Sequence, residues 1–144
     1  MATSDGELIA GPRAGRAAAK EVRRAQRKVA RRSRGSQRRR KAVALLARRR
    51  EHEANVRRDH AHKTARALIE RCDTICVEAL NVRGLAQGML AKDCTDQGWA
   101  AFLAHLRDKA EEAGRQMIPV DARNTSQACS ACGATAPKAL GVRV

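Results

Sequence analysis

The sequence predicts an α/β fold in which a long basic helical hairpin is followed by a short parallel sheet. Residues 16–32 are rich in Ala and Arg without Pro or Gly, and residues 37–71 repeat small apolar residues at helical spacing. A different pattern follows, because Ile75, Cys76 and Val77 stand in a row, as in a strand buried on both faces. A helix and a second strand come next, which predicts a parallel pair joined by a right-handed crossover.

The amino-terminal elements are predicted as a turn, a linker and two helices. Ser4-Asp5-Gly6 favours a hairpin turn, and since so few residues precede it, we expect the chain to begin inside a fold. Gly11–Gly15 is a linker, and Ser33–Ser36 separates the two helices. A thin apolar stripe runs along the second helix through Ala42, Leu45, Leu46, Ala61, Ala65, Leu68 and Ile69.

The carboxyl-terminal half carries the strand–helix–strand pattern. The first strand lies within residues 73–82, and Gly84 and Gly88 mark a loop after it. Residues 97–113 predict a helix with one apolar face formed by Trp99, Phe102, Leu103 and Leu106, and Gly114 is suited to end it. Residues 116–120 predict a second strand, at a sheet edge because it contains Pro119.

The core is expected to be lean. Apolar residues form 43% of the chain, but it has one Trp, one Phe and no Tyr, and much of the apolar share is Ala. At roughly 25 cal/mol per Å² of buried apolar area, small side chains stabilise a fold weakly.

The positive charge is concentrated in one segment. Net charge is +15, and Lys20–Arg50 holds 15 of the 30 Lys and Arg residues with Glu21 as its one acid. Such density predicts binding to a polyanion, most simply nucleic acid, which we favour over a solvated helix face or a disordered basic arm. The candidate contact residues are Arg23, Arg24, Arg27, Lys28, Arg31, Arg32, Arg34, Arg38, Arg39, Arg40 and Lys41.

The five cysteines are not expected to form disulfides. The first ten residues lack the basic start and apolar run of a signal peptide, so a reducing cytoplasm is the expected location. No apolar stretch approaches the roughly 20 residues that span a bilayer, so no membrane partner is expected. Cys76 is predicted to pack inside the strand as a small hydrophobe.

Glu78 is the acidic residue of greatest interest. It follows the apolar run at the carboxyl end of the first strand, the sheet edge at which open α/β folds bind ligands. One carboxylate cannot hold the two Mg²⁺ ions of a phosphodiester-cleaving site, so from the residues alone a solvated strand-end acid is the favoured interpretation. Asp73, Asp93, Asp96 and Asp121 have no spacing that forces them to join it.

Cys129-Ser-Ala-Cys132-Gly has the spacing of half a zinc knuckle. Structural zinc needs four ligands, so the pair alone is incomplete. A thioredoxin-like redox pair is disfavoured because no strand precedes it and no helix follows. His52, His60 and His62 lie on the long helix, where a histidine is more often a surface or core residue than a ligand.

Taken in order, several segments resemble the OrfB/TnpB family of transposon-encoded proteins, which is related to type V CRISPR effectors and has a RuvC-like nuclease domain. The resemblance runs nearly end to end, through TSDGELIAGPR, VRRAQRKVARRSRGSQRRRKAVALLA, NVRRDHAHKTARALIERCDTICVEALNVRGL and GWAAFLAHLRDKAEEAGRQMIPVDARNTSQACSACG. It implies a partial RuvC-like (RNase H-like) fold with a basic helical insert and half of a zinc ribbon. The expected divisions are 1–12 (strand and linker), 13–72 (insert), 73–122 (core) and 123–144 (ribbon).

The resemblance also implies an RNA-guided, Mg²⁺-dependent DNA endonuclease with three catalytic acids, the second of which falls on Glu78. This chain has Ala79 where the family often has Asp. The other two acids and the second half of the zinc site fall outside residues 1–144, so we expect a fragment that binds DNA and guide-like RNA without cutting alone. Whether it is an enzyme stays open, and the alternative is a non-catalytic interaction module that binds nucleic acid or a full-length relative.

Overall fold

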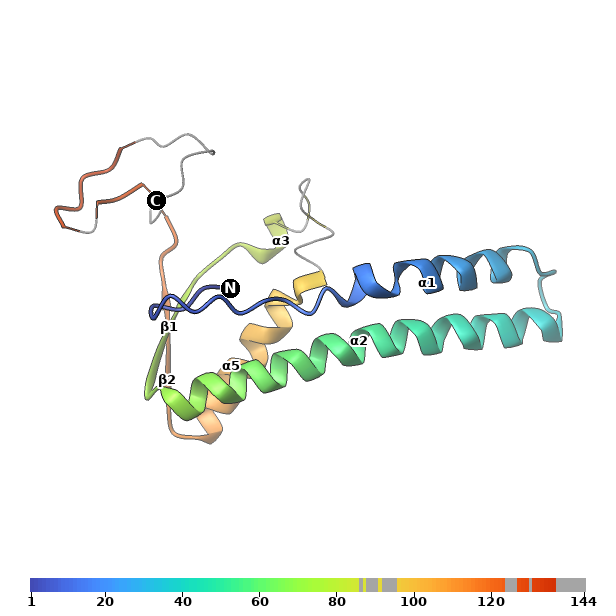
Figure 1. Ribbon diagram of the computed structural model, residues 1–144, viewed down its shortest axis with the longest axis horizontal. Coiled ribbons are helices and arrows are strands. Elements are labelled where there is room, and N and C mark those ends of the chain that lie inside the picture. The colour runs from blue at the N-terminus through green and yellow to red at the C-terminus, as the bar shows by residue number, and fades with distance from the viewer. Residues whose placement is uncertain (86, 88–90, 92–95, 124–126, 130, 137–144) are drawn as a thin grey trace.

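The computed structural model describes residues 1–85, 87, 91, 96–123, 127–129 and 131–136. An extended helical hairpin projects from one end of a small α/β unit (Figure 1). The described elements, in chain order, are α1 (Ala14–Ala30), α2 (Gln37–Arg71), β1 (Thr74–Glu78), α3 (Val82–Leu85), α5 (Trp99–Glu112) and β2 (Gln116–Val120).

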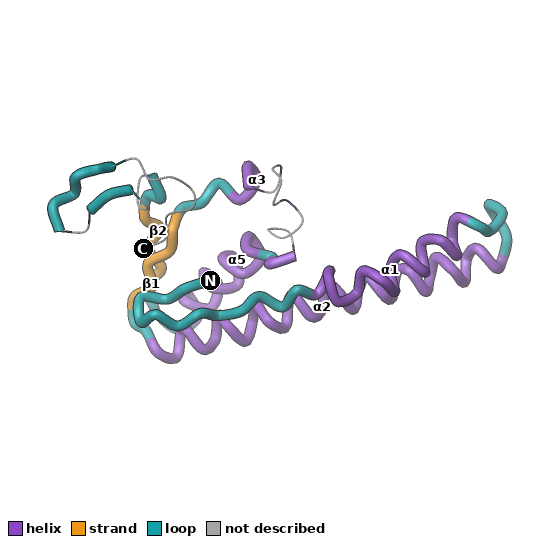
Figure 2. The backbone as a smooth tube through the Cα atoms, turned by 45° about the horizontal axis from the view of Figure 1, so that its top comes forward, coloured by secondary structure: helices purple, strands orange, loops and turns teal. Residues whose placement is uncertain are grey.

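The predicted helical hairpin is confirmed, and α2 has the predicted start and end. Its 35 residues span about 52 Å at 1.5 Å per residue. Ser36 caps the amino terminus of α2 by accepting a hydrogen bond from Arg39 N at 3.2 Å, and Gly35 turns the chain with φ 81°. The first helix starts two residues earlier than predicted, so Gly15 belongs to α1 rather than to the linker. Figure 2 shows the two helices running side by side for the length of α1.

The predicted parallel pair is also confirmed. Strands β1 and β2 pair in parallel with Cys76 opposite Ile118 and Glu78 opposite Val120. The prediction that β1 is buried on both faces is wrong, because Thr74, Cys76 and Glu78 are exposed while the alternate residues Ile75 and Val77 are half-buried. The prediction that Cys76 packs as a core residue fails for the same reason, since its side chain lies on the face that no described element covers.

The first strand ends at Glu78, earlier than the predicted range. The chain turns through Ala79–Asn81 and enters the short helix α3, which includes Gly84 in place of the predicted loop. Asn81 explains the change, because its side-chain Oδ1 accepts the backbone N–H of Gly84 at 3.0 Å, as a helix amino-terminal cap does. Gly88, also assigned to that loop, lies outside the described residues.

The core lies where α5 crosses α2. Its buried members are Ala61, Ala65 and Ile69 of α2 and Phe102, Leu106 and Ala110 of α5. Ile75, Val77 and Met117 of the sheet pack against this cluster, and so do Trp99 and Leu103. Three of the six buried members are Ala, which confirms the expectation of a lean core. Gly114, with φ 64°, ends α5 as predicted.

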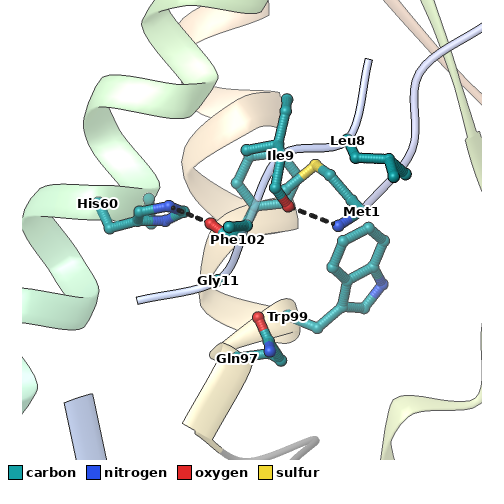
Figure 3. A pocket seen from close by; sticks show the side chains of 10 residues that line it. Met1, Leu8, Ile9, Gly11, His60, Gln97, Trp99 and Phe102 are labelled. Carbon is teal, nitrogen blue, oxygen red and sulfur yellow. Dashed lines mark hydrogen bonds between the residues drawn. The ribbon is translucent and has the colours of Figure 1, made fainter. Parts of the chain in front are cut away.

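The amino terminus folds over the α2–α5 junction. Ala2 and Leu8 form an antiparallel bridge around a turn at Gly6, whose φ is 80°, so the predicted hairpin exists in minimal form. His60 of α2 donates from Nε2 to the Ala10 carbonyl at 2.9 Å, and a largely apolar pocket of about 340 Å³ lies between this segment, Trp99 and Phe102 (Figure 3). No helix in the described part of the chain is long and apolar enough to cross a membrane.

Candidate nucleic-acid interface

The predicted contact residues lie on the projecting hairpin, in a segment (residues 20–50) that we call the basic arm. Ten of the eleven are exposed, and Arg39 is half-buried. Only Ala25 is buried within the arm, because small side chains let α1 and α2 pack closely while the long cationic side chains extend into solvent. The arm therefore presents a high density of guanidinium groups along two adjacent helices.

A groove of about 350 Å³ runs between the two helices of the arm. It is lined by Glu21, Arg24, Ala25, Arg27, Lys28, Arg31, Leu45 and Arg49. Glu21 pairs with Arg24 at 3.3 Å and with Arg49 at 3.8 Å, so two of the lining cations share one acid. In the described part of the chain, no ion pair engages Arg27, Lys28 or Arg31. These three cations are exposed and available to an anionic ligand.

Arg39 has a structural task in the fold. Its Nη1 donates to the Val29 carbonyl at 2.9 Å and to the Arg32 carbonyl at 3.1 Å. These carbonyls lie at the end of α1, where the last acceptors have no partner one turn further on, and the Val29 carbonyl also accepts the backbone N–H of Arg32 at 3.2 Å. Arg39 therefore ties the end of α1 to the start of α2, whereas the other ten candidates project from the arm.

Glu78 is at the carboxyl end of β1 and is exposed, as predicted. Its register partner is Val120, so Asp121 leaves the sheet at the same edge. The Asp121 carboxylate accepts the backbone N–H of Arg123 at 2.9 Å, which fixes a local turn. Asp73 lies at the opposite end of β1, where it pairs with Arg115. Asp93 lies outside the described residues, so the structure brings one further acid, Asp121, to the edge that carries Glu78.

Cys129 and Cys132 are exposed on a tight turn. The turn is closed by an antiparallel bridge between Ala128 and Thr135 and by a bond from Gly133 N to the Cys129 carbonyl at 2.8 Å, with Gly133 at φ 71°. Hydrogen bonds from the backbone N–H groups of Ala131 and Cys132, and then from the Cys132 side chain, lower the pKa of Cys129. A stabilised thiolate beside a second thiol suits two of the four ligand positions of zinc.

The remaining ligand candidates stay apart from this turn. Cys72 ends α2, Cys76 lies in β1, and Cys94 is outside the described residues. Within the described ranges, no group of three or more His, Cys, Asp and Glu side chains could hold a metal ion.

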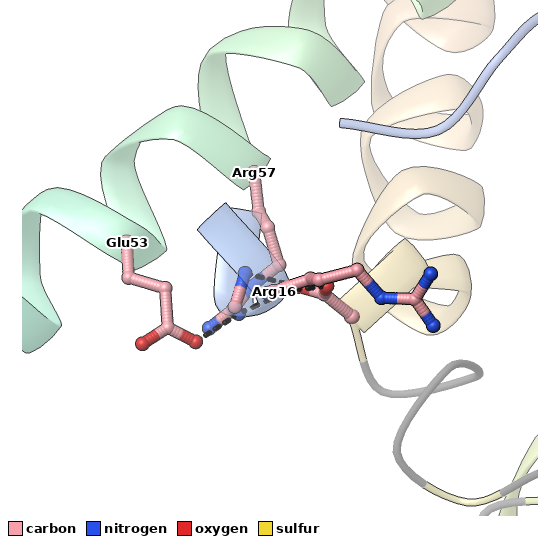
Figure 4. Close-up of polar contacts among 5 residues, drawn as sticks. Arg16, Glu53 and Arg57 are labelled. Carbon is pink, nitrogen blue, oxygen red and sulfur yellow. Dashed lines mark hydrogen bonds and ion pairs between the residues drawn. The ribbon is translucent and has the colours of Figure 1, made fainter. Parts of the chain in front are cut away.

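Asp96 positions the arm, a role that sequence reasoning missed. Its carboxylate accepts the backbone N–H groups of Gly15 at 2.5 Å and Arg16 at 3.1 Å, so it caps α1 from 80 residues away. The local N-cap, Arg13, makes no side-chain cap bond and has φ 45°. Arg57 of α2 links this cap to α2, with its Nη1 at 3.6 Å from Asp96 and at 2.6 Å from Glu53 (Figure 4). The missing local cap before Ala14 was the one sequence signal that a remote partner was needed.

The fold and the arm define a mixed α/β protein with a cationic helical hairpin and a Cys-x-x-Cys turn. Residues 1–89 match the OrfB_IS605 family model, described as a probable transposase, and residues 99–144 match the TNB domain model of Cas12f1-like proteins. The chain therefore belongs to the OrfB/TnpB family of transposase-related proteins.

Three curated relatives agree with this assignment. The chain is 33% identical to a Streptomyces pristinaespiralis protein named "Putative RNA-guided DNA endonuclease", over 90% of this chain and 33% of the relative. It is 31% identical to Escherichia coli (strain K12) "Putative RNA-guided DNA endonuclease InsQ", over 58% of this chain and 25% of the relative. It is 34% identical to the CRISPR-associated endodeoxyribonuclease Cas12f1 of Sulfoacidibacillus thermotolerans, over 70% of this chain and 24% of the relative. The chain thus spans a quarter to a third of these proteins.

Proposed function

We propose that this chain binds nucleic acid through the groove of the basic arm, and that its ligands are DNA and a guide-like RNA. The observation that carries the proposal is the set of exposed cations, Arg27, Lys28 and Arg31, along one groove with a single acid, Glu21. The names of the relatives, which specify RNA guidance and DNA cleavage, support the choice of ligands.

The physical basis is neutralisation of backbone phosphates. Arg and Lys side chains that contact phosphates release the counterions condensed on the nucleic acid, so the affinity falls as salt rises, with a slope of about −0.9 per contact in a plot of log K against log salt. Arg is favoured because its planar fork can bond two phosphate oxygens at once.

The test compares two double variants that remove the same charge. Arg27→Ala/Arg31→Ala removes two groove cations, whereas Lys63→Ala/Arg66→Ala removes two cations of α2 that are already paired with Asp59 at 2.8 Å and with Glu70 at 2.7 Å. Fluorescence anisotropy with labelled RNA and DNA should show a loss of about tenfold or more for the groove variant and a salt slope shallower by about two. Equal losses for both variants would show that net charge, rather than the groove, determines binding.

We further propose that residues 73–122 are part of a RuvC-like core and that residues 13–72 are its helical insert, after a strand and linker in residues 1–12. In this proposal Glu78 supplies one carboxylate ligand to Mg²⁺, which when bound stabilises negative charge on a phosphate undergoing cleavage. Its exposed position at the carboxyl edge of the sheet supports that role.

A two-metal site needs more carboxylates than Glu78 alone, so we infer that this chain binds nucleic acid without cutting it. Incubation of the purified chain with DNA, RNA and Mg²⁺ should leave the DNA intact. Cleavage that disappears in the Glu78→Ala variant would refute this inference and would make Glu78 catalytic.

We also propose that residues 123–144 include half of a zinc ribbon, in which Cys129 and Cys132 supply two ligands. The lowered pKa of Cys129 and the tight turn at Gly133 support this. Metal analysis should find weak zinc binding that Cys129→Ser abolishes. One tightly held zinc per monomer would contradict a half site.

A second candidate function, an interaction module, is favoured by the open face of the sheet. Ile118 and Val120 of β2 are 42% and 39% exposed, and both lie on the same face as Cys76. Exposed apolar strands invite pairing with another chain. Co-purification with a full-length relative, lost on Ile118→Lys, would support this role, whereas a monomer in the presence of that relative would exclude it.

A further inference from the structure

Two histidines from different helices stack on each other outside the basic arm. The ring centroids of His62 on α2 and His105 on α5 lie 4.0 Å apart, with an angle of 30° between the ring planes. His62 is exposed and His105 is half-buried, so solvent reaches the pair. His62 is 13 residues beyond Arg49 on α2, about 20 Å along the helix from the end of the groove.

The charges facing the pair are mainly positive. Lys109 lies one turn after His105 on α5, and Arg58 lies one turn before His62 on α2. Arg58 Nη2 donates to Asn55 Oδ1 at 2.8 Å, so its other guanidinium N–H groups are the ones left for an anion at the pair. The negative charge of Asp59 favours protonation of His62, but the Asp59 carboxylate is also paired with Lys63 at 2.8 Å. The pKa of His62 is lowered first by desolvation and then by His105, Lys109 and Arg58, whereas Asp59 opposes the change. Protonation of His62 is therefore disfavoured by its neighbours, and a bound anion would offset this effect.

We propose that His62, His105, Arg58 and Lys109 form a second anion site, which takes a phosphate group of a nucleic-acid backbone. Each of the four side chains offers N–H donors, and an imidazolium, a guanidinium and an ammonium all form charge-assisted bonds with phosphate oxygens. Because the cluster bridges α2 and α5, a strand bound there lies along the packed half of the molecule rather than on the arm. The site does not depend on the function proposed for the arm, since a free phosphate ion can test it directly.

The expected pH dependence follows from linkage. A bound phosphate stabilises the charged imidazoles, so it should raise the pKa of His62, and binding should strengthen as the pH falls. Without an anion, a fall in pH has the opposite effect, because it lowers folding stability. The folded-state pKa of His62 lies below its ordinary value of 6.5, so the unfolded chain takes up the proton more readily and folding stability declines as the pH falls through 6.5.

The experiment is an NMR titration of the histidine rings in the full chain, in chloride buffer, with inorganic phosphate and with a short DNA duplex. We expect the pKa of His62 to rise with each ligand. With inorganic phosphate the rise should exceed any change at His52, an exposed histidine of the same helix. Inorganic phosphate changes its own charge between pH 5.5 and pH 8, so the pH dependence is measured with sulfate, whose charge stays constant. Sulfate binding should be about tenfold tighter near pH 5.5 than near pH 8. A rise with inorganic phosphate alone would assign the site to free phosphate, and a rise with both would assign it to the backbone.

The matched variants are His62→Asn and His52→Asn, both at exposed positions of α2. The first leaves one imidazole in the site and should reduce the pH dependence of sulfate binding, whereas the second should retain it. Unchanged pH dependence in His62→Asn, or no rise in the pKa of His62 with either ligand, would overturn the proposal. The Arg27→Ala/Arg31→Ala variant should still bind inorganic phosphate at the pair, so failure of the arm and failure of this site are distinguishable.

Discussion

Asp96 is the residue on which the placement of the arm depends. It is 8% exposed, and its carboxylate joins the segment just before α5, where it lies, to the start of α1 and to Arg57 of α2. The close approach also requires Gly15, because a Cβ atom there would lie 2.8 Å from Asp96 Oδ1. A carboxylate at a helix amino terminus satisfies unpaired N–H groups and faces the positive end of the helix dipole.

We therefore expect Asp96→Ala to lower the free energy of unfolding by about 1–3 kcal/mol, since two backbone N–H groups lose a charged acceptor. Asp108→Ala, at an exposed position of α5, should change it little and serves as the control. Urea unfolding followed by circular dichroism measures both. Equal effects of the two substitutions would show that the cap contributes nothing beyond the loss of an acid.

At the scale of elements, α5 forms the core by packing against α2, which is otherwise largely exposed to solvent. Leu106 is completely buried and Phe102 is 4% exposed, and both pack against the Ala-lined face of α2. The sheet adds Ile75, Val77 and Met117, which are only partly buried. Loss of a large side chain from α5 is therefore poorly compensated by its small neighbours.

Leu106→Ala should destabilise this unit by about 2–5 kcal/mol, because it removes buried apolar area and leaves a cavity. The half-buried Leu103→Ala is the matched control and should be milder. Trp99 is the one tryptophan of the chain and packs against the core, so its fluorescence reports on this unit. An effect of Leu103→Ala equal to that of Leu106→Ala would contradict the assignment of the core.

At the scale of the whole molecule, stability and charge are separated along α2. The half that meets α5 contains Ala61, Ala65 and Ile69, all buried, whereas the basic arm buries only Ala25. The like charges of the arm repel one another, so its helices are the less stable part of the fold.

Hydrogen exchange should accordingly be faster over residues 20–50 than at Ala61, Ala65 and Ile69. Added RNA or DNA should slow exchange in the arm, because bound phosphates neutralise its charge. Uniform exchange along α2 without ligand would mean that the helix opens as one unit and that the arm has no separate stability.

The bounds of α2 and β2 could be predicted from the sequence, whereas the exposure of Cys76 and the role of Arg39 could not. Residues 37–71 and 116–120 coincide with α2 and β2, because helical periodicity and the position of Pro119 are local signals. The exposure of Cys76 was not predictable, since an apolar run predicts burial on both faces and the structure covers one face only. Of the candidate interface, the cations were found from charge density, but the capping role of Arg39 depends on the geometry of the turn.

The sequence by itself determined the family, the order of the elements, the basic arm and the Cys-x-x-Cys turn. Each of these follows from local composition or from the spacing of a few neighbouring residues. Only the tertiary structure decided that Asp96 caps α1 from 81 residues beyond Gly15, and that His105 stacks on His62. These contacts join residues far apart in the chain, so no local sequence pattern predicts them. They arise because α5 packs across α2, and that packing follows from burial of the few large apolar side chains that the chain has.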